Sequence, residues 1–126
     1  MIYLSLADAI QVMAAAIGRP PAVRDWGLLE AAIARPRTVV FGLEAYEGVW
    51  TKAGALMHSL VNNHALVDGN KRAGFACAAI FLHLNGHALT LTQDEAYDLT
   101  MLVATGQLAD PEAIGRRLAG QDSMGR

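Results

Sequence analysis

The 126-residue sequence has a single cysteine, Cys77. One thiol cannot form an internal disulfide bond, so a disulfide-stabilised secreted scaffold is excluded and a reducing cytoplasm is expected. Charged residues are also scarce, at 17% against 53% hydrophobic residues, which excludes a disordered, highly charged protein. This length and composition predict one folded domain over residues 1–126.

The sequence also lacks an excess of basic residues and a long apolar run. Ten Lys and Arg against twelve Asp and Glu give a formal net charge of -2, whereas proteins that neutralise nucleic-acid phosphates are usually basic. The longest apolar run, residues 73–82, is far shorter than the ~20 residues that span a bilayer. The N-terminus has the pattern of an amphipathic helix and no basic signal-peptide region. We therefore expect a cytoplasmic protein that binds neither nucleic acid directly nor a membrane.

Start and stop signals predict six helices, at about residues 6–17, 26–35, 49–63, 70–84, 93–105 and 111–119. Their N-terminal signals are capping boxes and aspartate caps, at Ser5 with Asp8, Asp25, Thr92 with Glu95, and Asp110. The fourth helix is apolar on every side, so we predict an all-α, compact bundle built around it as a buried central helix. Residues 36–48 are expected to form a surface loop, because Val39-Val40-Phe41 has no evident pairing partner. The tail, residues 120–126, is expected to be frayed.

One polar segment, residues 64–72, separates the third and fourth expected helices. A helix N-terminus attracts phosphate, because its first N–H groups are unpaired and carry partial positive charge. Gly69 allows the backbone to approach a ligand closely, and Asn70 is a suitable N-cap. Lys71 and Arg72 place two cations on the first turn, where the helix dipole disfavours them unless an anion binds there. The segment therefore predicts a phosphate site.

Two further residues of this segment carry chemistry. Asp68 offers a hard oxygen ligand suited to Mg²⁺, and His64 is the side chain best able to accept a proton near neutral pH. Each residue also has a structural interpretation: His64 as a helix-end cap, Asp68-Gly69 as a turn, and Lys71 with Arg72 as a solvated face. Their combination at one loop-to-helix junction favours the functional interpretation.

The other histidines and the cysteine are interpreted as structural. His83 and His87 have the spacing of a zinc pair, but Gly86 interrupts the helix between them and no third ligand follows. His58 is expected to lie in the core or line a groove, and Cys77 to be inert packing. The glycine-rich phosphate loops and the protein-kinase signature are missing from the sequence.

The segment resembles the signature of the Fic/Doc superfamily, and in particular of the Doc (death-on-curing) toxins of type II toxin–antitoxin systems. The Fic form is H-x-F-x-[DE]-G-N-G-R-x-x-R, and the Doc form has lysine for its third glycine and lacks the last arginine. The positions that match both forms are His64, Asp68, Gly69, Asn70 and Arg72. Lys71 matches the Doc form, and Phe75 stands where the last arginine would be. Leu66 departs from the usual phenylalanine but retains an apolar anchor, so a shifted loop is expected rather than lost activity.

The resemblance implies a kinase that transfers the γ-phosphoryl group of ATP to a threonine of a translation factor, elongation factor Tu, and so arrests translation. It implies that His64 is the base, that Asp68 holds Mg²⁺, and that nucleotide phosphates are held by Gly69, Asn70, Lys71 and Arg72. One alternative is a Fic-type AMP transferase, against which Lys71 and Phe75 argue. The other is a catalytically inactive binding module of a regulatory complex, against which the retained His64, Asp68 and Arg72 argue.

The sequence contains no inhibitory [ST]-x-x-x-E-[GN] motif, since Leu43 stands four positions before Glu47. Inhibition is therefore expected from a cognate antitoxin whose disordered C-terminal segment folds onto a groove near His64. The expected walls of that groove are the third helix and residues 36–48, with apolar anchors at Phe41, Tyr46 and Trp50.

Overall fold

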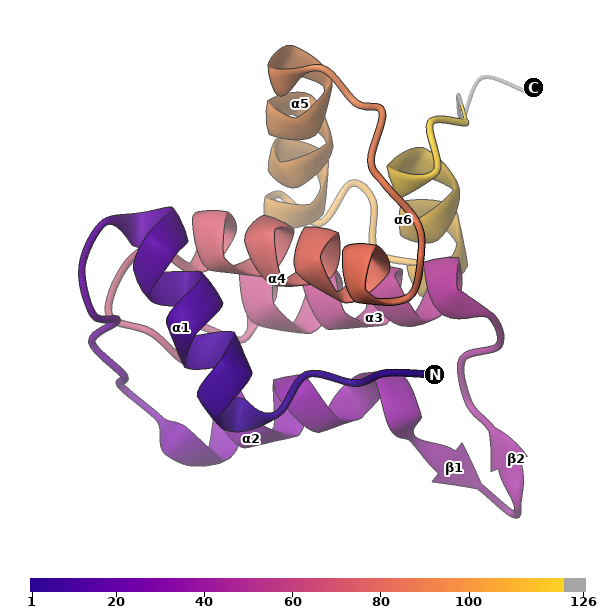
Figure 1. Cartoon of the computed structure of the whole chain (residues 1–126), viewed down its shortest axis with the longest axis horizontal. Coiled ribbons are helices and arrows are strands. Elements are labelled where there is room, and N and C mark those ends of the chain that lie inside the picture. The colour runs from indigo at the N-terminus through magenta and orange to yellow at the C-terminus, as the bar shows by residue number, and fades with distance from the viewer. Residues whose placement is uncertain (122–126) are drawn as a thin grey trace.

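The computed structural model describes residues 1–121, which form helices and one small hairpin (Figure 1). The helices are α1 (Leu6–Ile17), α2 (Trp26–Ala34), α3 (Val49–Asn62), α4 (Asn70–Leu84), α5 (Gln93–Ala104) and α6 (Pro111–Leu118), with a 3₁₀ turn η1 (Arg35–Arg37) after α2. The predicted all-α class and its helices are confirmed. Of the tail expected to fray, residues 122–126 lie outside the described residues.

The helix boundaries follow from side chains at the helix ends. The Ser5 hydroxyl accepts a hydrogen bond from the Asp8 N–H at 3.0 Å, and the Asp8 carboxylate accepts one from the Ser5 N–H. The second predicted capping box forms in the same way at the start of α5. Asp25 and Asp110 each accept one N–H from the first turn of their helices. Each such cap stabilises its helix by about 1 kcal/mol, so these boundaries are local properties of the sequence.

The centre of the core is shared by α3 and α4. Within the described residues, α3 packs against α2, α4, α5, α6 and η1, whereas α4 packs against α1, α3 and α5. On α4, Ile80 is 37% exposed and Leu84 is 41% exposed. The fourth helix therefore lies in the core, as predicted, although it shares the central position with α3 and α1 covers only part of its outer face. None of the helices between residues 1 and 121 is long and apolar enough to cross a membrane.

Residues 36–48 contain a hairpin, which corrects the expectation of a surface loop. Strand β1 (Val39–Val40) pairs antiparallel with β2 (Leu43–Glu44). The two residues between the strands, Phe41 and Gly42, have φ of 51° and 78°. Positive φ at both central residues is typical of a type I′ turn, whose twist suits a two-residue hairpin. The pairing partner of β1 therefore exists and lies only two residues further along the chain.

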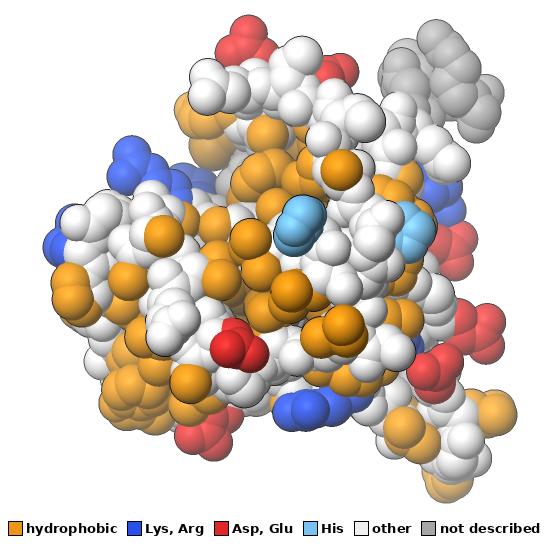
Figure 2. Space-filling view, in the orientation of Figure 1, with side chains coloured by type: hydrophobic (Ala, Val, Ile, Leu, Met, Phe, Trp, Pro, Cys, Tyr) orange, Lys and Arg blue, Asp and Glu red, His pale blue; other side chains and the backbone are white. Residues whose placement is uncertain are grey.

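The base of the hairpin is tied to α3 by Lys52, which is only 1% exposed. Its ammonium group donates to the Glu44 carboxylate at 3.1 Å and to the main-chain carbonyl of Tyr46. The tip residue, Phe41, is fully exposed, and apolar side chains of the hairpin are visible at the lower right of Figure 2. Of the aromatic anchors expected for a partner, Tyr46 and Trp50 are instead half-buried.

Candidate active site

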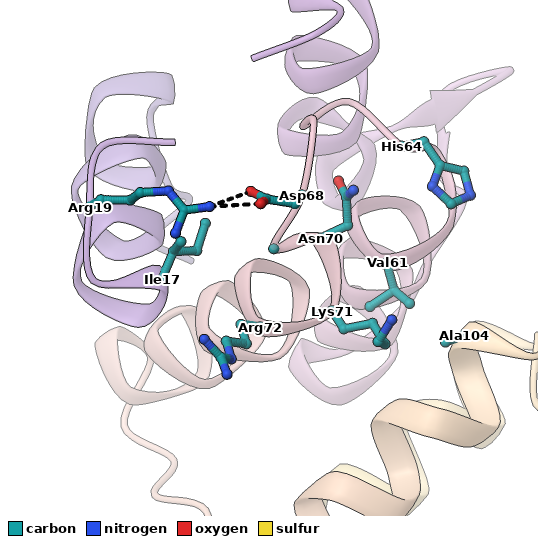
Figure 3. Close-up of a pocket in the computed structure, with 10 residues that line it drawn as sticks. Ile17, Arg19, Val61, His64, Asp68, Asn70, Lys71, Arg72 and Ala104 are labelled. Carbon is teal, nitrogen blue, oxygen red and sulfur yellow. Dashed lines mark hydrogen bonds and ion pairs between the residues drawn. The ribbon is translucent and has the colours of Figure 1, made fainter. Parts of the chain in front are cut away.

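The polar segment borders a cavity of about 470 Å³ at the N-terminus of α4 (Figure 3). Six of its lining residues are the predicted site residues His64, Asp68, Gly69, Asn70, Lys71 and Arg72. The other four come from α1, the α1–α2 connector, α3 and α5, and are Ile17, Arg19, Val61 and Ala104. No residue from 36 to 48 lines this cavity. The structure thus brings the predicted residues together but leaves the hairpin away from them.

His64 follows the C-terminal end of α3 in a left-handed backbone conformation, with φ of 55°. Few non-glycine residues adopt positive φ, although histidine is among those that are enriched there. The Arg24 guanidinium donates to the main-chain carbonyl of His64 from Nε at 3.0 Å and also from Nη2. Among residues 1–121 the exposed His64 imidazole has no hydrogen-bond partner, so its ring nitrogens are available to a substrate.

Gly69 is the N-cap of α4, with φ of 80° and no side chain to occupy the first-turn donors. The N–H groups of residues 70–72 precede the first hydrogen bond of the helix, which runs from Ala73 to the Gly69 carbonyl at 2.9 Å. A Cβ atom at Gly69 would lie 2.7 Å from Cδ1 of Ile17. Glycine is therefore needed at this position for two reasons: it adopts the positive φ without strain, and it leaves room for Ile17 of α1 at this wall of the cavity.

Asn70 is the first residue of α4, so the prediction that it acts as the N-cap is wrong. Its side-chain Oδ1 accepts the Leu66 N–H, and its Nδ2 donates to the Leu66 carbonyl, both at 3.1 Å. The side chain of Leu66 is 3% exposed, so the apolar anchor expected at this position is present. Because its amide closes the loop, Asn70 offers a phosphate its main-chain N–H rather than its side chain.

Lys71 and Arg72 lie exposed on the first turn of α4, which has no acidic residue. A cation at this end of a helix is unfavourable by about 0.3–1 kcal/mol, because it faces the positive end of the helix dipole. Neither side chain has an ion-pair partner within residues 1–121. Two cations and open N–H groups on one turn make a site that an anion would stabilise.

Asp68 is paired with Arg19, a residue that the sequence analysis did not single out. Nη2 of Arg19 lies 2.7 Å from each carboxylate oxygen of Asp68, as the dashed lines in Figure 3 mark. Both side chains are more than half exposed, at 57% and 61%, and such surface pairs typically contribute 0.2–1 kcal/mol. The two residues are 49 positions apart, and Arg19 belongs to no motif, so nothing in the sequence points to this contact.

The donor set suits one class of metal ion. Residues 1–121 contain no cluster of three His, Cys, Asp or Glu side chains that could hold a metal ion. A carboxylate such as Asp68 beside a turn with open N–H groups and two cations fits Mg²⁺, which usually binds through one or two carboxylates together with substrate phosphates. His87 makes a packing contact instead: its ring lies edge-on against Trp50, with the ring centroids 5.2 Å apart. This contact supports the structural interpretation of His87.

His58 and Cys77 lie outside the cavity. Burial, with the nearby Arg35 charge, lowers the pKa of His58 below its ordinary value of 6.5. Nη1 of Arg35 lies 2.9 Å from Nδ1 of His58, and because arginine can only donate, Nδ1 accepts and the ring is neutral. Burial raises the pKa of the Cys77 thiol to about 12, so this thiol is inert at neutral pH, as its interpretation as packing predicts.

The chain is similar to known proteins over most of its length. A model of the Fic/DOC family matches residues 3–82, which include α1 to α3 and most of α4. A protein named Toxin Doc from Mycolicibacterium smegmatis is 48% identical over 120 residues, covering 94% of this chain and 92% of that protein. The family match thus spans the entire segment from His64 to Arg72.

Proposed function

Since this chain belongs to the Fic/DOC family, we propose that it is a Doc-like toxin that transfers the γ-phosphoryl group of ATP to a protein hydroxyl. The name of its relative from Mycolicibacterium smegmatis, Toxin Doc, supports the toxin role. The observation that carries the chemistry is the cavity in which His64 and Asp68 lie beside the first turn of α4, with two unpaired cations.

The proposed reaction needs one proton acceptor and one anion site. His64 accepts the proton of the target hydroxyl while its oxygen forms a bond to the γ-phosphorus, and the bond from that phosphorus to the β,γ-bridging oxygen breaks to release ADP. The open N–H groups of Gly69 to Arg72, with the Lys71 and Arg72 side chains, hold and neutralise the phosphates. Asp68 would hold Mg²⁺ with those phosphates, and the ion supplies further charge neutralisation.

Two residues favour phosphoryl transfer over AMP transfer. Lys71 places a side chain and a charge where the Fic form of the motif has bare backbone. Phe75, a half-buried apolar residue, stands where that form has its second arginine, so the AMP-transfer pose would lack one phosphate clamp. Positioning and charge stabilisation dominate phosphoryl transfer, so the phosphorus presented to the hydroxyl decides which reaction occurs.

The proposed target is a threonine of elongation factor Tu in the cytoplasm, and the proposed inhibitor is a cognate antitoxin with a disordered C-terminal segment. The hairpin offers exposed apolar residues to such a segment, with Val40 50% exposed and Leu43 72% exposed. However, the hairpin is anchored near the start of α3 and His64 follows its end, and α3 is about 21 Å long. A segment that covers both has to run along α3.

The test compares the wild type with His64→Ala and with a matched control, His83→Ala, which removes an exposed histidine outside the cavity. Each protein is incubated with elongation factor Tu, ATP and Mg²⁺, and the target is weighed by mass spectrometry. We expect the wild type and the control to add one phosphoryl group, and His64→Ala to lose about 10²–10⁴-fold in rate while remaining folded. Addition of AMP, or unchanged transfer by folded His64→Ala, contradicts the proposal. Absence of any transfer supports the binding module instead.

A further inference from the structure

The connector between α1 and α2 pairs with the loop that carries His64. Val23 and Leu66 form an isolated antiparallel β-bridge. Main-chain hydrogen bonds of 2.7–3.1 Å flank this bridge in both directions, between residues 22–25 and residues 65–67. The loop is therefore attached to a second segment of the chain immediately after His64, and this attachment uses backbone atoms alone.

The side chain of Arg24 adds a contact of a different kind. Its Nε and Nη2 both donate to the main-chain carbonyl oxygen of His64, 40 positions away along the chain. His64 is at the same time one of two non-glycine residues between positions 1 and 121 with positive φ. A non-glycine residue keeps such a conformation only where its surroundings over-determine it, and such positions cluster at active sites.

We propose that Arg24 is a positioning residue for His64, which rests on the proposed function in which His64 is the base. The guanidinium holds the carbonyl of the His64–Ala65 peptide, and Oδ1 of Asn63 accepts its N–H at 3.1 Å. Together these contacts fix the plane of the peptide and with it the direction in which the imidazole leaves the backbone. Arg24 is not among the residues that line the cavity. Its effect on the reaction passes through the orientation of His64.

The phosphate site is held in place by other contacts. The Asn70 side chain fixes the loop at Leu66, and α4 begins independently at Gly69. Loss of the Arg24 guanidinium leaves the backbone bridge and these contacts intact. The loop therefore stays attached, while the His64–Ala65 peptide loses both hydrogen bonds to its carbonyl and keeps only the one from the Ala65 N–H to Oδ1 of Asn63, at 3.1 Å. Held at one end alone, this peptide is less constrained, so substitution of Arg24 lowers kcat and leaves the KM for ATP unchanged.

The experiment compares Arg24→Gln and Arg24→Lys with Arg116→Gln, which removes the same charge from an exposed pair on α6. With elongation factor Tu as acceptor, we expect Arg24→Gln to lose about 10²-fold in kcat at constant KM for ATP, a loss typical of a displaced catalytic group. Arg24→Lys retains a donor but not the two-donor fork, so we expect an intermediate kcat. Arg116→Gln should match the wild type, and thermal melts should show all variants folded at the assay temperature.

A second measurement does not depend on activity. Hydrogen exchange of the Ala65 amide, which belongs to the His64–Ala65 peptide, should be faster in Arg24→Gln than in Arg116→Gln, because the carbonyl of that peptide is no longer held. The amides of Leu66 and Val67 should exchange at the wild-type rate, because they donate to Asn70 and to the Ala22 carbonyl. Wild-type exchange of the Ala65 amide or wild-type kcat in Arg24→Gln overturns the positioning role, as does a loss that appears in KM alone. If the wild-type protein transfers nothing, the proposed function fails, and the exchange measurement still decides whether Arg24 holds this loop.

Discussion

Replacement of Gly69 by alanine tests whether the glycine at the start of α4 is needed for the backbone, for the approach of α1, or for both. Gly69 has φ of 80°, and its added methyl group would lie 2.7 Å from Cδ1 and 2.9 Å from Cγ1 of Ile17. Gly86→Ala is a matched control, because Gly86 has φ of 87° and nothing within 4 Å of the position of its Cβ. The difference between the two variants isolates the contact with Ile17.

The expected magnitudes follow from these two terms. A left-handed conformation costs an L-residue about 1–2 kcal/mol, and this cost is common to both variants. At Gly69 the Ile17 side chain also has to leave its preferred rotamer, which costs about 0.5–1.5 kcal/mol more. Gly69→Ala should therefore be less stable than Gly86→Ala by about 1 kcal/mol, a difference of about 3–5 °C in Tm for a domain of this length.

The assay combines thermal unfolding, followed by circular dichroism, with calorimetric titration of a non-hydrolysable ATP analogue and Mg²⁺. Because Gly69 and Ile17 line the cavity, Gly69→Ala should also bind the analogue more weakly, whereas Gly86→Ala should bind it as the wild type does. Adding Ile17→Ala to Gly69→Ala removes all three atoms that the methyl group meets, so the two substitutions should be less destabilising together than their sum. Equal stabilities of Gly69→Ala and Gly86→Ala, with wild-type binding in both, would refute this reasoning.

Two further predictions concern charge. Arg19→Gln frees both oxygens of Asp68, so Mg²⁺ binding, measured by calorimetry, should tighten by up to about fivefold. The control Arg116→Gln should leave Mg²⁺ binding unchanged. Weaker binding in Arg19→Gln would contradict the idea that Arg19 competes with Mg²⁺ for Asp68. The lowered pKa of His58 means that the unfolded chain takes up a proton at higher pH than the folded protein does, so its neutral ring contributes stability that is lost as pH falls below about 6.5. The fall in Tm on acidification should be smaller in His58→Gln, and identical pH profiles would exclude His58 as a contributor.

The candidate site was predictable where its residues are close together in the sequence. His64, Asp68 and the first turn of α4 belong to one segment of nine residues, so their motif and the helix start were both visible before folding. The role of Asn70 could not be predicted from the sequence, because an asparagine beside a helix start can either cap the helix or bind the preceding loop. The choice depends on the path of the loop back to Leu66.

The sequence alone determined the all-α class and the helix boundaries, because helix caps and hydrophobic periodicity act between residues a few positions apart. It also identified the segment from His64 to Arg72 as the candidate site, because these residues are neighbours in the chain. Only the tertiary structure decided that Arg19 pairs with Asp68, that Arg24 holds the carbonyl of His64, and that Lys52 is buried beneath the hairpin. The two arginines meet partners 49 and 40 positions away, and no local pattern marks either of them. Such contacts exist only once packing of α1, α3 and α4 has brought the connector and the loop together.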